Sequence, residues 1–430
     1  MIKKIISKFK KSKIAKNSMW MIATTIIQMI ISLFVNRIVA NYLTVSDYGI
    51  LNYSISFVTF FTSLCTLGLN SIIIKELINN KNKNGELLGT SVVMRLVSSL
   101  ISIMLIFILI VVLKGNNKPI IICAILQSLA LLFDSFNIIN LWFQSIYKVK
   151  IISIIGLFAY LFVAFYKIYL VLQNKPIYWF AFANSLSAII IAILLIIAYC
   201  YKHGQKLIFS PKTAKYLLKN SYHFIFSGLM VAIYAQTDKI MIGSMIDDIS
   251  AVGIYAVSTT IINLWYFVPN SIITSYNPTI VAAKQESNEL YVKKIKQLYC
   301  IILWFSIAYA LFITIFSKII ILILYGKKYL SAMTTLSIGV WGVLFSFVGV
   351  VREIWLVNEG KQKYSKWFAL IGAVVNIILN FIMIPIFGIT GAAIATFVTQ
   401  LIVGLISNLF FKDTRINFKY MLEALIFKFN

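Results

Sequence analysis

Stretches of about 20 mostly apolar residues recur along this chain, separated by short polar or Gly/Pro-containing breaks. An α-helix needs about that length to cross the hydrocarbon core of a bilayer. We therefore predict an all-α polytopic membrane protein with twelve transmembrane helices, over residues 18–40, 49–74, 88–113, 119–142, 151–172, 177–201, 221–246, 253–278, 298–325, 331–357, 365–388 and 390–411.

The charge pattern predicts how these helices are oriented. Lys and Arg number 39 against 13 Asp and Glu, a formal net charge of +26. On a soluble protein this excess would suggest nucleic acid, but 60% hydrophobic and 12% charged residues exclude a soluble domain. Most of the cations fall in alternate connecting segments and at both ends. By the positive-inside rule, both termini lie in the cytoplasm, and no nucleic-acid partner is expected.

The chain matches itself at an offset near half its length. Residues 16–18 (KNS) recur at 219–221, and residues 70–73 (NSII) recur at 270–273. Each half holds six predicted spans, so the two repeats are parallel, and a cavity between them is typical of transporters. We predict a basic N-terminal segment (1–17), an N-lobe (18–201), a cytoplasmic linker helix (202–220), a C-lobe (221–411) and a cytoplasmic tail (412–430).

The basic N-terminal segment offers two interpretations. Ile2, Ile5, Ile6 and Phe9 would share one face of a helix with lysines on the other. Such a helix suits the surface of an anionic inner leaflet. A frayed basic tail is the plainer alternative.

The sequence lacks the motifs of membrane enzymes and ATP-driven pumps. No Walker A, HExxH or GxGxxG motif is present, and the four cysteines and two histidines are scattered. A membrane-embedded glycosyltransferase or polymerase would need a large outer loop or a carboxylate-rich loop, which the predicted topology does not provide. We predict no catalytic residues, no cofactor and no metal site. A non-transporting assembly scaffold remains an alternative.

Charged residues inside the predicted spans are the candidate site residues, because such groups are costly in lipid and by default face a cavity or a partner. The cations exceed the anions; they are Arg37, Arg95, Lys167, Lys239, Lys318 and Arg352, against Asp134, Asp238 and Glu353. A cationic interior favours an anionic substrate, above all phosphate. Lys167 and Lys318 lie near span ends, where snorkelling explains them.

The remaining charged residues have competing interpretations. Arg37 and Lys239 occupy matching places in the two repeats, as substrate contacts or as interface anchors. Arg95 and Asp134 could pair across neighbouring helices, in a structural or a functional role. Asp238 and Lys239 point about 100° apart on a helix and should not form a closed pair.

Further candidates are weaker. Arg352 and Glu353 lie near a cytoplasmic span end, where an interfacial role competes with substrate binding. Asp134 and Asp238 are the deep titratable groups for ion coupling. Pro269 and Pro385 are candidate hinges or static kinks. Aromatic faces for sugars, also typical of membrane interfaces, are offered by Trp142, Trp265, Tyr266, Trp341 and Trp355.

Several motifs resemble one transporter family. They are Asn36-Arg37 followed by residues 47–49 (DYG), residues 237–243 (TDKIMIG), residues 252–255 (VGIY) and residues 384–396 (IPIFGITGAAIAT). Together with the length and the two six-helix halves, they resemble the Wzx-type polysaccharide repeat-unit flippases of the multidrug/oligosaccharidyl-lipid/polysaccharide exporter superfamily.

The resemblance implies a V-shaped transporter of two lobes around a central cavity. It would move an undecaprenyl-diphosphate-linked oligosaccharide from the inner to the outer leaflet of the bacterial cytoplasmic membrane by alternating access. O-antigen, capsule or exopolysaccharide assembly would follow, with a polysaccharide polymerase and a chain-length regulator as partners beside the membrane lipids. In related flippases arginines of the first spans line the cavity, which Arg37 fits best; Arg95 and Arg352 have less support.

Two rivals belong to the same superfamily. A cation-coupled multidrug exporter is expected to carry acidic residues in its cavity, and the first span here has none. A lipid II flippase is nearer in chemistry but generally has two further spans.

Overall fold

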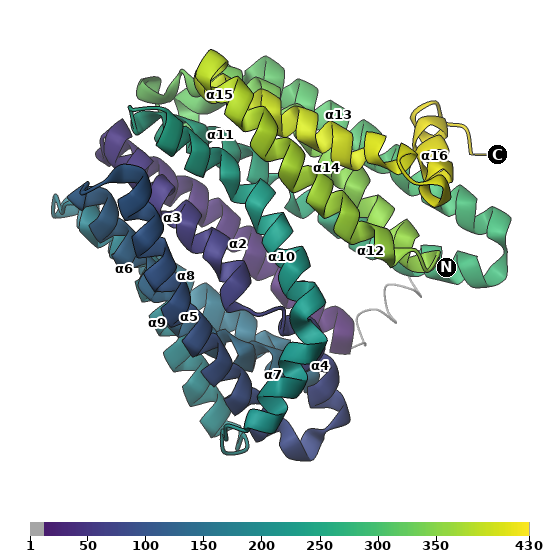
Figure 1. Cartoon of the computed structure of the whole chain (residues 1–430), viewed down its shortest axis with the longest axis horizontal. Helices are drawn as coiled ribbons and strands as arrows, with labels where there is room; N and C mark the ends of the chain where they lie inside the picture. The colour runs from purple at the N-terminus through teal and green to yellow at the C-terminus, as the bar shows by residue number, and fades with distance from the viewer. Residues whose placement is uncertain (1–12, 430) are drawn as a thin grey trace. The chain divides into compact units, whose positions relative to one another are not determined.

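The computed structural model describes residues 13–429, and all of their regular elements are helices (Figure 1). The expected amphipathic helix at residues 2–9 lies outside the described residues. The α-helices are α2 (Lys13–Tyr42), α3 (Val45–Cys65), α4 (Asn70–Asn79), α5 (Asn84–Lys114), α6 (Lys118–Asp134), α7 (Ile139–Ser145), α8 (Val149–Leu172), α9 (Ile177–Tyr201), α10 (Pro211–Met245), α11 (Ser250–Leu264), α12 (Phe267–Glu286), α13 (Asn288–Leu324), α14 (Ala332–Asn358), α15 (Ser365–Gly404) and α16 (Arg415–Leu425). Short 3-10 helices connect some of them, among them η2 (Ser135–Ile138) and η5 (Ile406–Leu409).

Ten helical stretches of the described residues are long and apolar enough to cross a membrane. They confirm an all-α, multi-pass membrane protein. The expected span 49–74 is not among them, because it is divided between α3 and α4 and α3 is rich in Ser, Thr and Asn. The last two expected spans fall within one stretch, Gln362–Leu409. The count of twelve and the sidedness therefore stay predictions.

Two expected spans are interrupted at positions that the internal repeat aligns. α3 and α4 are separated at residues 66–69, where Leu67 and Gly68 have φ of 51° and 61°. A Cβ atom on Gly68 would lie 2.6 Å from the Cβ of Phe224, so only glycine fits this approach to α10. In the other half, α11 ends at Leu264 and α12 begins at Phe267. The second span of each half thus breaks at a corresponding place.

The two candidate hinge prolines lie beside helix breaks. Pro269 is buried in the first turn of α12, where a missing backbone N–H costs little. Pro385 lies inside α15, three residues before Gly388, whose φ of 57° and ψ of −137° interrupt the helix. Pro278, inside α12, was not anticipated. Whether these breaks move stays a prediction.

The contacts between residues divide the chain into two units, 1–232 and 233–430. In unit 1 the larger core cluster is built mainly from α4, α5, α7 and α9 around Phe143 and Leu195, and a smaller one from α2, α8 and α9. In unit 2 the core is built mainly from α12, α13, α14 and α16 around Phe347 and Trp355, and Phe368 of α15 joins it. The V shape, the central cavity between lobes and the proposed lobe limits stay predictions.

The connection between the two halves is not a separate helix. Residues 204–210 lie outside any helix, and α10 begins at Pro211, as the Ser-Pro pair indicated, but continues without interruption to Met245. The non-helical segment is fastened to α5: Gln205 Oε1 accepts from Gly85 N at 2.9 Å, and Gly85 O accepts from Ile208 N at 3.2 Å. The expected linker helix is therefore the first part of α10.

The C-terminal tail is a docked helix. Met421 and Ala424 of α16 are buried in the core of unit 2. The Nζ of Lys296, itself almost fully buried, lies 2.7 Å from Glu423 Oε2, and Tyr299 donates to Asn417 at 3.1 Å. The hydrogen bond from Lys296 holds the pKa of Glu423 below its usual range. This ion pair thus fixes α16 on α13.

We expect Glu423→Gln to lower the stability of unit 2 by about 1–3 kcal/mol, because Lys296 would lose its carboxylate partner in a mostly dry environment. Lys419→Gln is the matched control, since Lys419 is exposed and 3.8 Å from the same carboxylate. Thermal unfolding of the purified protein measures both. A carboxylate with a lowered pKa stabilises above its ordinary pKa and less as pH falls, so the difference between wild type and Glu423→Gln should shrink toward about pH 4. Equal melting of the two variants at neutral pH would contradict this role.

Candidate functional site

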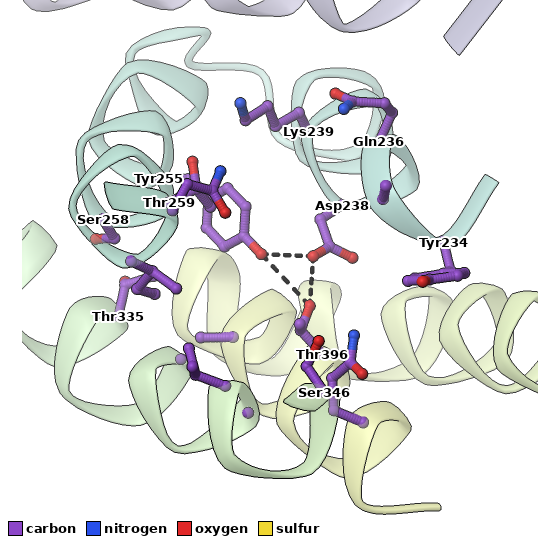
Figure 2. A pocket seen from close by; sticks show the side chains of 18 of the residues that line it. Tyr234, Gln236, Asp238, Lys239, Tyr255, Ser258, Thr259, Thr335, Ser346 and Thr396 are labelled. Atoms are coloured by element: carbon purple, nitrogen blue, oxygen red, sulfur yellow. Dashed lines mark hydrogen bonds between the residues drawn. The ribbon is translucent and has the colours of Figure 1, made fainter. Parts of the chain in front are cut away.

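The carboxylate of Asp238 is the centre of a polar cluster inside unit 2. Its side chain leaves α10 and is only 6% exposed. Figure 2 shows it directed toward Tyr255 of α11 and Thr396 of α15, and both hydroxyls donate to Oδ2, Tyr255 at 2.5 Å. Asn376 and Asn380 donate to Oδ1 at 3.1 and 2.7 Å. Four donors therefore surround this one carboxylate.

These donors explain how a carboxylate is tolerated inside an apolar helix bundle. Burying a charge costs several kcal/mol unless hydrogen bonds replace the lost water. Asn376 and Asn380 precede the break at Gly388, and Thr396 follows it, so Asp238 links α10 to both parts of α15. The cluster thus fixes the geometry of the interrupted helix.

Sequence reasoning identified Asp238 but not its partners. Two asparagines four residues apart in the apolar α15 were the available signal, because that spacing places both amides on one face of a helix. Tyr255 and Thr396 were noticed only as members of motifs, and nothing in their spacing tied them to Asp238.

A cavity of about 290 Å³ lies beside this cluster, within unit 2. Four helices contribute to its wall: α10, α11, α14 and α15. Its lining is rich in amides, hydroxyls and tyrosines, and includes Tyr234, Gln236, Asp238, Lys239, Tyr255, Ser258, Thr259, Asn263, Tyr266, Thr335, Ser346, Thr396 and Gln400.

Lys239 follows Asp238 on α10 and lines the same cavity. Figure 2 shows the two side chains leaving the helix in different directions. Among the described residues they form no ion pair, as the helical geometry predicted, and no hydrogen bond or ion pair engages the Lys239 ammonium. Lys239 is therefore a cation that lines a polar cavity without a direct ion pair or hydrogen bond to another described residue, although the Asp238 carboxylate lines the same cavity.

Arg37 is exposed on α2 in unit 1. No hydrogen bond or ion pair to another described residue holds its guanidinium. Both of its interpretations, as a substrate contact and as an interface anchor, stay predictions.

The expected pair of Arg95 and Asp134 is not formed. Arg95 is 3% exposed, and its Nη2 donates to Asn70 Oδ1 at 2.6 Å, so it stabilises the start of α4 after the break at residues 66–69. Asp134 instead accepts from Asn137 at 3.1 Å. Each charged group is therefore paired with a nearby amide, Arg95 with Asn70 and Asp134 with Asn137, and not with the opposite charge.

Asp134 lines a second cavity, of about 310 Å³, in unit 1. Polar groups on this wall come from α3, α6, η2 and α9: Thr59, Thr62, Asp134, Asn137, Asn184 and Ser187. Arg95 is not part of it. The charged group of this cavity is thus an anion.

Arg352 is committed to the packing of α14 against α15. It is 4% exposed and forms an ion pair with Glu353 at 3.0 Å. Its Nη1 donates to the carbonyl oxygen of Val403, and also to the hydroxyl of Ser407 at a distance of 3.3 Å. The guanidinium lies 4.0 Å from the ring centre of Phe368. Neither cavity includes Arg352. These contacts give it a structural role.

Most of the candidate aromatic residues are also engaged in packing within the protein. Trp142 and Trp355 are buried in the cores, and Trp265 stacks on Tyr309 with ring centres 4.1 Å apart. Tyr266 alone of the five lines the cavity of unit 2. Within residues 13–429, no group of three or more His, Cys, Asp or Glu side chains is arranged to hold a metal ion.

Family comparisons agree with this architecture. Residues 14–284 match the polysaccharide biosynthesis protein family, and residues 224–382 match the MatE family. An uncharacterized membrane protein of Methanocaldococcus jannaschii is 29% identical over 231 residues, 50% of this chain and 45% of that protein. The chain thus spans less than half the length of this relative.

Solved structures share the fold at low sequence identity. The lipid II flippase MurJ, in an inward closed conformation, superposes with a TM-score of 0.79 at 18% identity, over 94% of this chain and 89% of MurJ. An inward-facing multidrug resistance MATE family transporter gives 0.66 at 14% identity, over 92% and 96%. A MOP superfamily transporter from Pyrococcus furiosus gives 0.56 at 12% identity, over 95% and 96%.

The Asp238 cluster generates a test with a neighbouring control. Thr396→Val should destabilise the protein by about 2 kcal/mol, because a buried carboxylate loses one of its donors. Thr399→Val, three residues later, should change stability by less than about 0.5 kcal/mol, because the buried Thr399 hydroxyl has no hydrogen-bond partner among the described residues. Chemical or thermal unfolding of the purified variants measures the difference. Equal losses would show that Thr396 does not support Asp238.

Proposed function

Because the chain belongs to the polysaccharide biosynthesis protein family, we propose that it is a flippase that moves an undecaprenyl-diphosphate-linked oligosaccharide across the membrane. The direction is from the inner to the outer leaflet of the bacterial cytoplasmic membrane, with both termini in the cytoplasm. The Wzx type is part of this proposal, whereas the wider superfamily is shown by the family and fold matches.

The main support for the proposal is the ammonium of Lys239, which forms no ion pair or hydrogen bond with another described residue. It lines a polar cavity in which the one carboxylate is already satisfied by four hydrogen bonds. An ammonium in such surroundings attracts an anion, and a diphosphate is an anion that Lys binds as a point charge. Lys239 and Arg37 are the proposed diphosphate contacts, whereas Arg95 and Arg352 are better explained as structural residues.

The proposed transport cycle uses alternating access. The diphosphate and sugars would occupy polar cavities while the lipid tail stays in the bilayer. The break at Pro385 and Gly388 and the break before Pro269 are the candidate places for bending. The exported repeat units would serve O-antigen, capsule or exopolysaccharide assembly, with a polymerase and a chain-length regulator acting on them.

The likeness in fold to a lipid II flippase and to a multidrug exporter keeps both as alternatives. The first shares the diphosphate chemistry. The second would use an acidic residue for ion coupling, and Asp238 and Asp134 are the candidates in the two cavities.

We expect charge removal at both proposed diphosphate contacts, Arg37→Gln with Lys239→Gln, to abolish surface glycan in a complementation assay at unchanged protein level. Lys318→Gln is the control, because Lys318 is an exposed lysine of α13 whose position near a span end suits snorkelling. Immunoblotting of the membrane fraction verifies the protein level. Normal glycan in the double variant would overturn the assignment of these two residues.

We expect Asp238→Asn to remove any dependence of transport on a sodium or proton gradient, because the neutral amide can neither attract a cation nor release a proton. Asp134→Asn tests the second candidate in the same way. Transport into vesicles with and without an imposed gradient measures the coupling. Gradient dependence that persists in the Asp238→Asn protein would exclude Asp238 as the coupling group.

A further inference from the structure

Three amide side chains in the cavity of unit 2 make no hydrogen bond within the described part of the chain. Gln236 of α10, Asn263 of α11 and Gln400 of α15 line its wall, and none of them has a hydrogen-bond partner among the described residues. Asn376 and Asn380, by contrast, each donate an amide N–H to Asp238. Each amide carries two N–H donors and a carbonyl acceptor. The cavity therefore offers a set of neutral, unused hydrogen-bonding groups.

The position of Lys239 disfavours a cationic ligand group beside it. The Asp238 oxygens already accept four hydrogen bonds from neutral donors, so an ammonium group would have to displace one of these donors to bond to the carboxylate. Lys239 adds a positive charge on the same wall. A ligand group that enters beside Lys239 is consequently either anionic or uncharged.

The cavity is small and has apolar faces as well as amides. Its volume of about 290 Å³ lies at the low end of ligand pockets, which suits a single ring and not a whole oligosaccharide. The side chains of Tyr234, Tyr266, Ile262 and Val343 provide apolar surface on its wall. A pyranose presents C–H groups on its faces and hydroxyls around its rim, which matches this mixture.

We propose that this cavity binds one uncharged sugar, the residue attached directly to the diphosphate, through Gln236, Asn263 and Gln400. The inference rests on the proposed function, because a diphosphate held at Lys239 places the adjoining sugar beside these amides. An N-acetylated hexosamine fits the site, since its acetamido group pairs with amides and its methyl group contacts the apolar wall. A sugar with a free amine fits less well, because its ammonium group would be repelled by Lys239 and would have to displace a donor from Asp238.

The test measures equilibrium binding of three lipids to the full-length protein in nanodiscs. The probes are undecaprenyl diphosphate alone, the same lipid carrying N-acetylglucosamine, and the same lipid carrying glucosamine. Wild type should bind the N-acetylglucosamine lipid about tenfold more tightly than the other two, the gain expected from one or two added hydrogen bonds. The Gln236→Ala, Asn263→Ala, Gln400→Ala triple variant should bind all three lipids with similar affinity.

Two controls separate sugar binding from diphosphate binding. Lys239→Gln should weaken all three lipids together, whereas the triple variant should keep its affinity for undecaprenyl diphosphate alone. The three amides have no hydrogen-bond partners among residues 13–429, so the triple variant should unfold at the wild-type temperature. Single alanine variants, each expected to lose part of the preference, repeat the test if the triple variant does not fold.

Each outcome bears on the proposal. Equal binding of the bare and sugar-bearing lipids by wild type, or a preference that survives the triple variant, overturns the sugar subsite while leaving the proposed transport function intact. Tighter binding of the glucosamine lipid overturns the preference for an uncharged sugar. If none of the three lipids binds to the wild-type protein, both the proposed function and the sugar subsite are overturned.

Discussion

A bilayer core provides no water to pair with backbone N–H and C=O groups, so a chain that crosses it keeps its hydrogen bonds within helices. Interruptions are tolerated where protein or a polar cavity surrounds them. The described part of this chain follows that constraint. Thr62, just before the break between α3 and α4, lines the cavity of unit 1, and Tyr266, between α11 and α12, lines the cavity of unit 2. Helix breaks and cavities therefore occur together in both units.

The same lack of water separates structural charges from available ones. A charge inside the bundle is tolerated when neighbours satisfy it. Arg95 has Asn70, Arg352 has Glu353 and carbonyl and hydroxyl oxygens, and Asp238 has four donors. Lys239 has no such partner in the part of the chain that the structure describes, and it lines the cavity of unit 2. Its position beside unused amides is the basis for assigning both the diphosphate and the sugar.

The apolar stretches predicted helices and a multi-pass membrane protein because the length and the apolar pattern of each stretch can be read from neighbouring residues alone. The divergence of Asp238 and Lys239 was predictable for the same reason. The pairing of Arg95 with Asp134 was wrong because it ranked charge above proximity, and an amide at Asn70 was nearer. The donors to Asp238 were missed because Tyr255 and Thr396 meet it only through the packing of distant segments. The excess of cations inside the predicted spans likewise overestimated how many of them are available to a substrate, because Arg95 and Arg352 are held by contacts within the protein.

The most direct test of the account is a translocation assay in sealed proteoliposomes. Undecaprenyl diphosphate bearing N-acetylglucosamine would be placed in one leaflet, and its appearance in the other would be followed with a membrane-impermeant enzyme that modifies the exposed sugar. We expect rapid exposure with the wild-type protein, and exposure at the rate of protein-free vesicles with the Arg37→Gln, Lys239→Gln variant. Wild-type protein that exposes the sugar no faster than empty vesicles, in either orientation and with or without an ion gradient, would contradict it.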